Sequence, residues 1–427
     1  MKRMFMFLTA LMTAAAIFAG GKQAESGGTG GVTEVVFWSA MSGVNGEAQQ
    51  KIVDDYNARQ NKVHVSAVFQ GSYYDMIAKV TAAVAGGETP HLAMIEMASI
   101  KMLADYGILT DMTQLARNAG FDAKAFYPGL MSSCDWGEGL YAVPFNRSTP
   151  MFYYNKDMFK EAGLDPNAGP RNWTELREFA RKLSIKDKRW GYEQPIDAWF
   201  YEAFLMQSGA QILNANHTDI AYNNKAGTDP LTLWKAMIAE GSMKAPPGKE
   251  YNSWEAARAD FAAGIAGMIM SSAGDLGALK TACKFEIGTC FLPANTRYGA
   301  PTGGANLVML AGHEKDGEAV MDFLKYATGP EPAAYFAMRS GYVCTSPAAA
   351  ETKLFQDYIA ANPNAKTVLE QLEKYTDIPR PVNARYPQIH NEIEMTEIQR
   401  CIENPNVTPE MAVQAISDQV RTLLARK

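Results

Sequence analysis

Between residues 33 and 96 the sequence alternates between short apolar runs and segments with helical periodicity. Residues 35–38, 63–67 and 92–95 have the length and composition of buried strands, and residues 47–58 between them repeat apolar side chains at helical spacing. Strands that alternate with helices form parallel sheets, because each right-handed crossover helix returns the chain to the end of the sheet at which the previous strand began. This pattern predicts an α/β fold.

The carboxyl ends of these strands carry three candidate binding residues. Trp38 ends the first strand, Tyr73 follows the second, and Glu96 ends the third. In open α/β sheets, ligands bind outside the carboxyl ends of the strands, so we expect the three side chains to share one rim. The alternatives stay open: core packing for Trp38 and a solvated position for Glu96.

A change of lobe is predicted between residues 144 and 166. Residues 144–148 are polar, residues 149–154 are β-prone and aromatic, and Pro144 and Pro150 favour extended backbone. A short helix and a glycine-containing restart follow. With 427 residues, the chain exceeds what one hydrophobic core usually serves. We therefore predict two lobes joined by a hinge that carries ligand contacts.

The start of the chain predicts export. Residues 1–20 combine Lys2 and Arg3 with an apolar run and small residues, as in a secretory signal peptide, and residues 21–31 form a flexible Gly/Ser leader. Gly21 stands where a lipoprotein would have its modified cysteine. The sequence thus predicts a freely diffusing periplasmic protein with no lipid anchor.

Charge and cysteine content exclude several partners. The net charge of −6 is spread along the chain without a Lys/Arg-rich run, which argues against nucleic acid or an anionic membrane as partner. The five cysteines contain no Cys-x-x-Cys pair, so we expect no zinc and no other metal or cofactor. Cys283 and Cys290 either form a bridge across a hairpin or remain buried thiols.

Several motifs carry a family resemblance. Residues 144–150 read Pro-Phe-Asn-Arg-Ser-Thr-Pro, residues 153–159 read Tyr-Tyr-Asn-Lys-Asp-Met-Phe, and residues 163–166 read Gly-Leu-Asp-Pro. With the Gly-Gly-Ala at residues 303–305, they resemble the extracellular solute-binding proteins of ATP-driven sugar importers, over residues 33 to 427. Within that family the chain is most similar to members that bind glycerol-3-phosphate.

The resemblance implies a two-lobed periplasmic-binding-protein fold, with the ligand in the cleft between the lobes. Each lobe would be a mostly parallel sheet flanked by helices. Residues 32–145 and 273–326 would form the N-terminal lobe, and residues 146–272 and 327–427 the C-terminal lobe. This interleaved division comes from the family alone.

The resemblance also implies a ligand-binding set. Hydroxyls, backbone amides and an arginine suit a phosphate, and a carboxylate accepts from polyol hydroxyls. The residues carried over are Tyr73, Glu96, Ser148, Ser272, Gly304 and Tyr342, with Arg385 as the arginine and Arg380 as its competitor. Trp199 is a further candidate, either covering the ligand or packing in the core.

Arg147 departs from the family pattern, because it stands in the hinge motif where a small residue is usual. We hypothesise that it adds a second cation and shifts preference toward a more anionic ligand. Unchanged affinity and selectivity in an Arg147→Ser variant would refute this hypothesis.

The expected function is capture of glycerol-3-phosphate or glycerophosphodiesters for an ABC transporter permease, by a protein that we expect to be monomeric. Neutral sugars or short oligosaccharides are the alternative ligands, and a sensor role stays open. A hydrolytic enzyme is the least favoured class: the five histidines are scattered, and Glu392, Glu394 and Glu397 match one solvated helix face better than a catalytic carboxylate pair.

Overall fold

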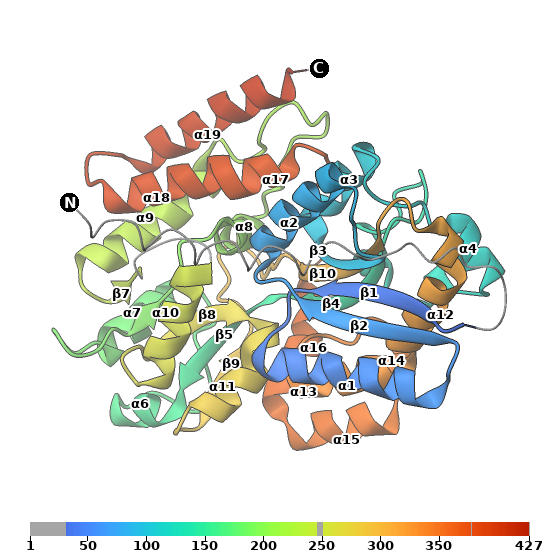
Figure 1. Ribbon diagram of the computed structural model, residues 1–427. Helices are drawn as coiled ribbons and strands as arrows, with labels where there is room; N and C mark the ends of the chain where they lie inside the picture. Colours follow the sequence, from blue (N-terminus) through green and yellow to red (C-terminus); the bar gives the residue numbers. More distant parts are fainter. Residues whose placement is uncertain (1–30, 246–250, 377, 427) are drawn as a thin grey trace, which may run out of the picture.

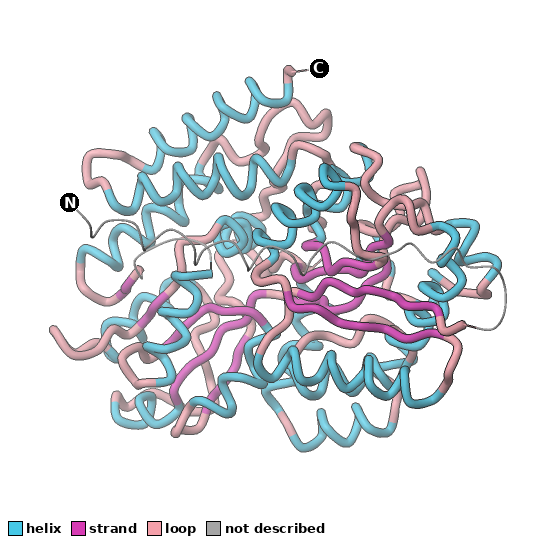
Figure 2. Tube along the Cα trace, viewed as in Figure 1, coloured by secondary structure: helices cyan, strands magenta, loops and turns pink. Residues whose placement is uncertain are grey.

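The computed structural model describes residues 31–245, 251–376 and 378–426 (Figure 1). The expected signal peptide and residues 21–30 of the leader lie outside these ranges. The described chain forms two five-stranded sheets, which Figure 2 shows as two separate groups of strands with helices around each. The two-lobed α/β architecture predicted from the sequence is confirmed.

The first sheet has the strand order β2-β1-β3-β10-β4. Its strands are β1 (Thr33–Ser39), β2 (Val63–Phe69), β3 (Leu92–Glu96), β4 (Val143–Ser148) and β10 (Gly303–Met309). Strand β1 pairs in parallel with β2 and β3, whereas β10 is antiparallel to β3 and β4. The sheet is therefore mixed, and the strands predicted from alternation form its parallel half.

Helices cover both faces of the first sheet because its central strands are apolar on both sides. Phe37 and Met94 face a core with α1 (Gly43–Arg59) and α12 (Gly317–Ala327). Ala93 and Ile95 face the opposite core with α2 (Tyr73–Gly86) and α3 (Ile100–Asp105). Helix α2 begins with a capping box, in which Ser72 and Asp75 exchange hydrogen bonds.

The second sheet repeats this arrangement of pairings, with the order β7-β6-β8-β5-β9. Its strands are β5 (Pro150–Asn155), β6 (Tyr192–Glu193), β7 (Met243–Lys244), β8 (Met268–Ser272) and β9 (Ile287–Cys290). Strand β6 is parallel to β7 and β8, and β5 is antiparallel to β8 and β9.

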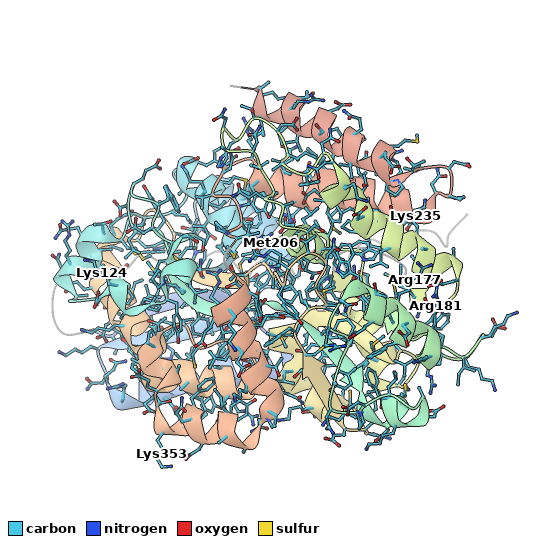
Figure 3. All side chains as sticks on the ribbon, turned by 180° about the vertical axis from the view of Figure 1, so that it is seen from behind. Lys124, Arg177, Arg181, Met206, Lys235 and Lys353 are labelled. Carbon is cyan, nitrogen blue, oxygen red and sulfur yellow. The ribbon has the colours of Figure 1, made fainter. Side chains whose placement is uncertain are left out.

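Two layers of helices enclose the second sheet. One core contains side chains of α7 (Trp173–Leu183), α8 (Ala198–Gln207), α9 (Lys225–Ala239), α18 (Met395–Glu403) and α19 (Pro409–Leu424). The other contains side chains of α10 (Tyr251–Ala262), α11 (Leu276–Ala282) and α16 (Pro363–Tyr375). Lys235 of α9, labelled in Figure 3, donates to the carbonyls of Cys401, Asn404 and Val407 at distances of 2.8, 3.1 and 2.8 Å, which fixes α9 to the end of α18.

The remaining elements are short or connect the lobes. They are α4 (Thr113–Asn118), α5 (Pro128–Met131), α6 (Lys156–Glu161), α13 (Pro330–Ser340), α14 (Pro347–Ala350), α15 (Lys353–Ala361), α17 (Tyr386–Gln388), the 3₁₀ turns Met97–Ser99, Ala123–Ala125, Ala273–Asp275 and Glu314–Asp316, and a π-helical segment Ile389–Glu394. Within the described ranges, no helix combines the length and apolarity needed to span a bilayer.

Three details differ from the sequence-based lobe division. The polar residues 146–148, expected in the C-terminal lobe, form the end of β4 in the first sheet, and the chain crosses to the second sheet at Thr149. Strand β9 pairs with β5, so the return to the first sheet follows β9 rather than preceding it. In α13, Phe336 packs with Phe145 of the first lobe, their ring centroids 4.9 Å apart. Sequence alone does not show that residues 146–148 belong to the first sheet, because their partners in β10 lie far away in sequence.

The structure also decides between a disulfide bridge and free thiols for Cys283 and Cys290. All five thiols are free, including Cys283 and Cys290. Burial raises the pKa of the Cys283 thiol to about 11 and raises that of Cys290 as well, as expected for inert thiols in an apolar setting.

Candidate functional site

A cavity of about 470 Å³ is lined by residues of both sheets and of the segments that join them. Seven of the nine binding residues predicted from the sequence line it: Tyr73, Glu96, Ser148, Trp199, Ser272, Gly304 and Tyr342. They come from segments that range from residue 73 to residue 342, and the packing of the two lobes against each other brings them together. The cavity lies where a two-lobed fold places its ligand.

Part of the cavity wall, the hydroxyl end, presents hydroxyl groups where strands end. Ser148 ends β4 and Ser272 ends β8, and the sheet register places them opposite Gly303 and Pro150 respectively. The hydroxyl oxygen of Ser272 accepts from the amide of Gly274 at 3.1 Å, which leaves its proton available. Within the described chain, the Ser148 hydroxyl has no hydrogen-bond partner. Both hydroxyls can therefore donate to an anion.

Tyr342 and Gly304 complete this end. A Cβ on Gly274 would lie 2.5 Å from the ring of Tyr342, so only glycine leaves room for the ring. Burial raises the pKa of Tyr342, although hydrogen bonds with Tyr73 and Asn146 partly offset it, so the phenol stays protonated and can donate. Gly304 has φ +86°, and a Cβ there would lie 2.0 Å from the carbonyl oxygen of Asn146. Glycine at this position lets the backbone line the cavity directly.

The cavity wall also contains an ion pair between the lobes. The Nη1 of Arg380 donates to Oε1 of Glu96 at 2.9 Å, and Oε2 of Glu96 accepts from the amide of Ala98 at 2.9 Å. Glu96 keeps 21% of its side chain exposed, whereas Arg380 keeps 2%. The carboxylate is therefore held at the cavity wall with room to accept from ligand hydroxyls.

Arg380 is itself fixed by a buried network. Its Nε donates to Oε2 of Glu202 at 3.1 Å and to the hydroxyl of Tyr386 at 2.9 Å, and its Nη2 lies 3.2 Å from Nε2 of His390. Burial lowers the pKa of Arg380, but Tyr386, Glu202 and Glu96 outweigh this and hold it well above the usual value. Burial raises the pKa of Glu202, but the charges of Arg380 and His390 outweigh burial and bring this pKa below its usual value. The carboxylate is therefore charged. The guanidinium is thus permanently charged and rigidly placed.

An aromatic wall closes a third side. The indoles of Trp199 and Trp254 stack with centroids 5.7 Å apart and an interplanar angle of 11°. Asp197 organises both, because its side chain accepts from the amide of Trp199 at 2.8 Å and from Nε1 of Trp254 at 2.8 Å. Trp199 is 7% exposed, belongs to the core of the C-terminal lobe and also lines the cavity, and its contact with a ligand stays a prediction.

Two predicted residues lie elsewhere. Arg385 does not line the cavity, because its position just before the short helix α17 keeps it in the loop, where its amide is bonded to Asn383. Arg380, its competitor, takes the place in the wall. Trp38 faces the core between the first sheet and α2, because the strand alternation turns it away from Phe37 and into that layer. Trp38 is partly buried and packs against this core, as the core alternative expects.

Sequence reasoning missed other lining residues, among them Asp197, Trp254, Arg258 and Asn391. Asp197 had a local signal, since an Asp before an apolar helical run is typical of an N-cap. Trp254 and Arg258 lie on α10, which carries no local pattern of a binding site.

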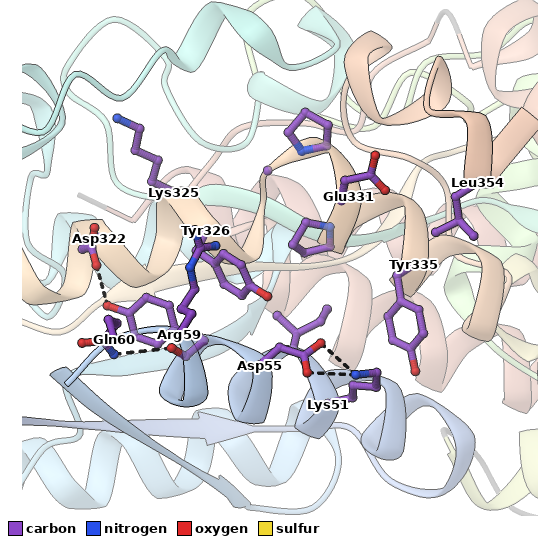
Figure 4. Close-up of a pocket in the computed structure, with 15 residues that line it drawn as sticks. Lys51, Asp55, Arg59, Gln60, Asp322, Lys325, Tyr326, Glu331, Tyr335 and Leu354 are labelled. Carbon is purple, nitrogen blue, oxygen red and sulfur yellow. Dashed lines mark hydrogen bonds and ion pairs between the residues drawn. The ribbon is translucent and has the colours of Figure 1, made fainter. Parts of the chain in front are cut away.

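A second cavity of about 880 Å³ lies against the N-terminal lobe, between α1 and the α12–α13 region (Figure 4). Several of its charged groups are already engaged: Lys51 pairs with Asp55 at 2.8 Å, and Asp322 accepts from Tyr56 at 2.7 Å. The guanidinium of Arg59 lies 4.6 Å from the ring centroid of Tyr326. None of the predicted binding residues lines this cavity, so its larger size does not make it the better candidate.

Two clusters have the residue types of a metal site, but their hydrogen bonds do not fit one. In the cluster of His91, His313 and Asp316, Nδ1 of His91 accepts from the amide of Val36 at 3.2 Å, which leaves the proton on Nε2, the atom nearest Asp316. In the cluster of Glu202, His390 and Glu394, Arg380 occupies the place of a cation.

Comparison with known proteins agrees with this geometry. The family model described as bacterial extracellular solute-binding protein matches residues 51–364. The chain belongs to this family. It is therefore a solute-binding protein with a small-molecule ligand, and not an enzyme.

Individual relatives cover most of the chain. The sn-glycerol-3-phosphate-binding periplasmic protein UgpB of Yersinia pseudotuberculosis is 29% identical over 386 residues, covering 85% of this chain and 86% of the relative. UgpB of Pectobacterium atrosepticum is 27% identical over 428 residues, covering 94% and 93%.

Solved structures share the fold. UgpB from Mycobacterium tuberculosis, in complex with glycerophosphocholine, has a TM-score of 0.83 and 23% identity, covering 93% of this chain and 99% of the other. The GacH receptor of Streptomyces glaucescens, solved unliganded and with acarbose, also has a TM-score of 0.83, with 20% identity and coverage of 92% and 99%.

Proposed function

We propose that this protein captures glycerol-3-phosphate or a glycerophosphodiester in the periplasm and delivers it to the permease of an ABC importer. The observation that carries the proposal is a cavity to which both lobes contribute: Ser148, Ser272, Tyr342 and the Gly304 backbone, together with Glu96 and Arg380. The hydroxyls, the backbone and the arginine can donate to a phosphate, and the carboxylate can accept from polyol hydroxyls. The UgpB relatives, which are named for glycerol-3-phosphate, support this choice.

Lobe closure supplies the mechanism. Besides the Arg380–Glu96 pair, Tyr74 donates to Asn391 at 3.3 Å and Asn45 to the carbonyl of Gly274 at 3.2 Å, so both lobes meet around the cavity. Closing the cleft removes water from the ligand and multiplies its contacts. A closed form that persists with ligand is the form that a permease would recognise.

Neutral sugars are the second candidate, because the stacked Trp199–Trp254 wall offers a flat apolar surface for the C–H face of a sugar ring. A thermal-shift titration with glycerol-3-phosphate, glycerophosphocholine and maltose separates the two. A ligand at 100 times its dissociation constant stabilises the folded state by about 2.7 kcal/mol. Stabilisation by the phosphorylated ligands supports the proposal, and stabilisation by maltose alone would replace it with the second candidate.

A further inference from the structure

The guanidinium of Arg147 is a fully buried cation whose partners are all neutral. Its side chain is 0% exposed. It donates to the carbonyls of Gly303 (2.9 Å) and Leu130 (3.1 Å), the hydroxyls of Ser133 and Thr302 (both 3.2 Å), Oδ1 of Asn306 (3.2 Å) and Sδ of Met97 (2.8 Å). Throughout the described ranges no carboxylate pairs with it. A buried charge without a counter-ion is costly and calls for a reason.

The charge persists at physiological pH. Burial lowers the pKa of Arg147 to about 10, which still leaves the group protonated near neutrality. The charge of Glu96 raises the pKa of Arg147 and that of Arg380 lowers it, but no carboxylate pairs with Arg147 directly, because Glu96 and Glu202 both pair with Arg380. Within the described residues, Arg147 therefore has no carboxylate partner of its own.

Arg147 lies immediately behind the hydroxyl end of the cavity. In the sheet register it is opposite Gly304, and the next residue, Ser148, is opposite Gly303. Its Nη2 holds the hydroxyl of Thr302, and the carbonyl of Thr302 accepts from Nε1 of Trp199 at 3.3 Å. Arg147 does not line the cavity itself, so it acts on the ligand through its electric field and through β10.

We propose that Arg147 is a specificity-determining residue that makes this site prefer doubly charged ligands over singly charged and neutral ones, without touching them. The proposal rests on the proposed function, in which the hydroxyl end binds a phosphate. For charges on the order of 8 Å apart in a medium of effective dielectric constant about 20, each ligand charge changes the affinity about tenfold or more. A phosphate monoester carries close to two charges and a diester carries one, so the buried cation separates the two classes.

The test is isothermal titration calorimetry of the mature protein with glycerol-3-phosphate, glycerophosphoglycerol and maltose at constant ionic strength. Arg147→Gln and Arg147→Met remove the charge, Arg147→Lys keeps it, and Arg117→Gln, exposed on α4, is the matched control for net charge. The neutral variants should lower the affinity for glycerol-3-phosphate about tenfold more than that for the diester. Arg147→Lys should keep the wild-type ratio, and so should the control.

Two results would overturn the proposal. If the neutral variants weaken all ligands by one common factor, Arg147 only positions β10. If Arg147→Lys behaves as Arg147→Gln does, the hydrogen-bond fork matters and the charge does not. Failure of the proposed function is distinguishable, because it appears in the wild type as binding of maltose alone, and in that case a charge-selective role for Arg147 is refuted as well.

Discussion

Replacing Arg380 with methionine tests the site most directly, because this residue joins the two lobes and compensates a buried carboxylate. Methionine fills a similar volume but removes the bonds to Glu96, Glu202 and Tyr386. Glu96 is partly exposed and can regain water, whereas Glu202 is 0% exposed and cannot. The loss of stability should therefore come chiefly from Glu202.

The expected magnitude is about 3 kcal/mol in the free energy of unfolding. Removing one partner of a buried ion pair typically costs about 3–5 kcal/mol. The lower end applies here, because His390 remains 2.7 Å from Glu202 and still compensates it in part. Losing the guanidinium raises the pKa of Glu202 in the folded variant, and a raised pKa stabilises the folded state at low pH. The deficit should thus be smaller at pH 5 than at pH 8.

Urea denaturation of wild type and variant at both pH values measures these quantities, and calorimetry measures ligand affinity. Arg385→Met is the matched control: it removes an arginine of the same loop that does not line the cavity, and should stay within about 0.5 kcal/mol of wild type. A deficit below about 1 kcal/mol for Arg380→Met, or one independent of pH, would refute the charge-compensation reasoning. Equal effects of the two substitutions on ligand affinity would refute the assignment of Arg380 to the site.

Three further predictions follow from single residues. Burial, and after it the charge of Asp260, raises the pKa of Glu193 to about 8, so the free energy of unfolding should fall as the pH rises from about 5 to 8. In urea titrations, Glu193→Gln should flatten this slope. An unchanged slope would contradict the prediction. Trp199→Ala should weaken ligand binding measured by calorimetry, whereas Trp38→Ala should lower the melting temperature and leave affinity nearly unchanged, and the reverse outcome would exchange their roles. Gly304→Ala should lower the free energy of unfolding by about 1–2 kcal/mol because of the left-handed backbone alone, and by more because the new Cβ clashes with the Asn146 carbonyl. A melting temperature equal to that of wild type would contradict this prediction and show that β10 adjusts freely.

Much of the fold was predictable because the information is local. The alternation that places β1, β2 and β3 reflects which faces of each strand are buried, and that pattern is written in neighbouring residues. Tyr73 and Glu96 follow from the same logic, since the carboxyl ends of parallel strands meet at one edge of a sheet. The hydroxyl and glycine positions came from motif resemblance, and the cavity contains them.

What the sequence by itself determined, then, is the pair of α/β lobes and seven of the residues that line the cleft. Only the tertiary structure decided between Arg380 and Arg385, because that choice depends on Glu96 and Glu202, whose positions in the sequence lie far from both arginines. It also decided that β9 joins the second sheet and that Arg147 is buried among neutral acceptors. Local pattern reports how a segment folds, whereas the partner that satisfies a buried charge or pairs with an edge strand is set by which distant segments the fold brings together.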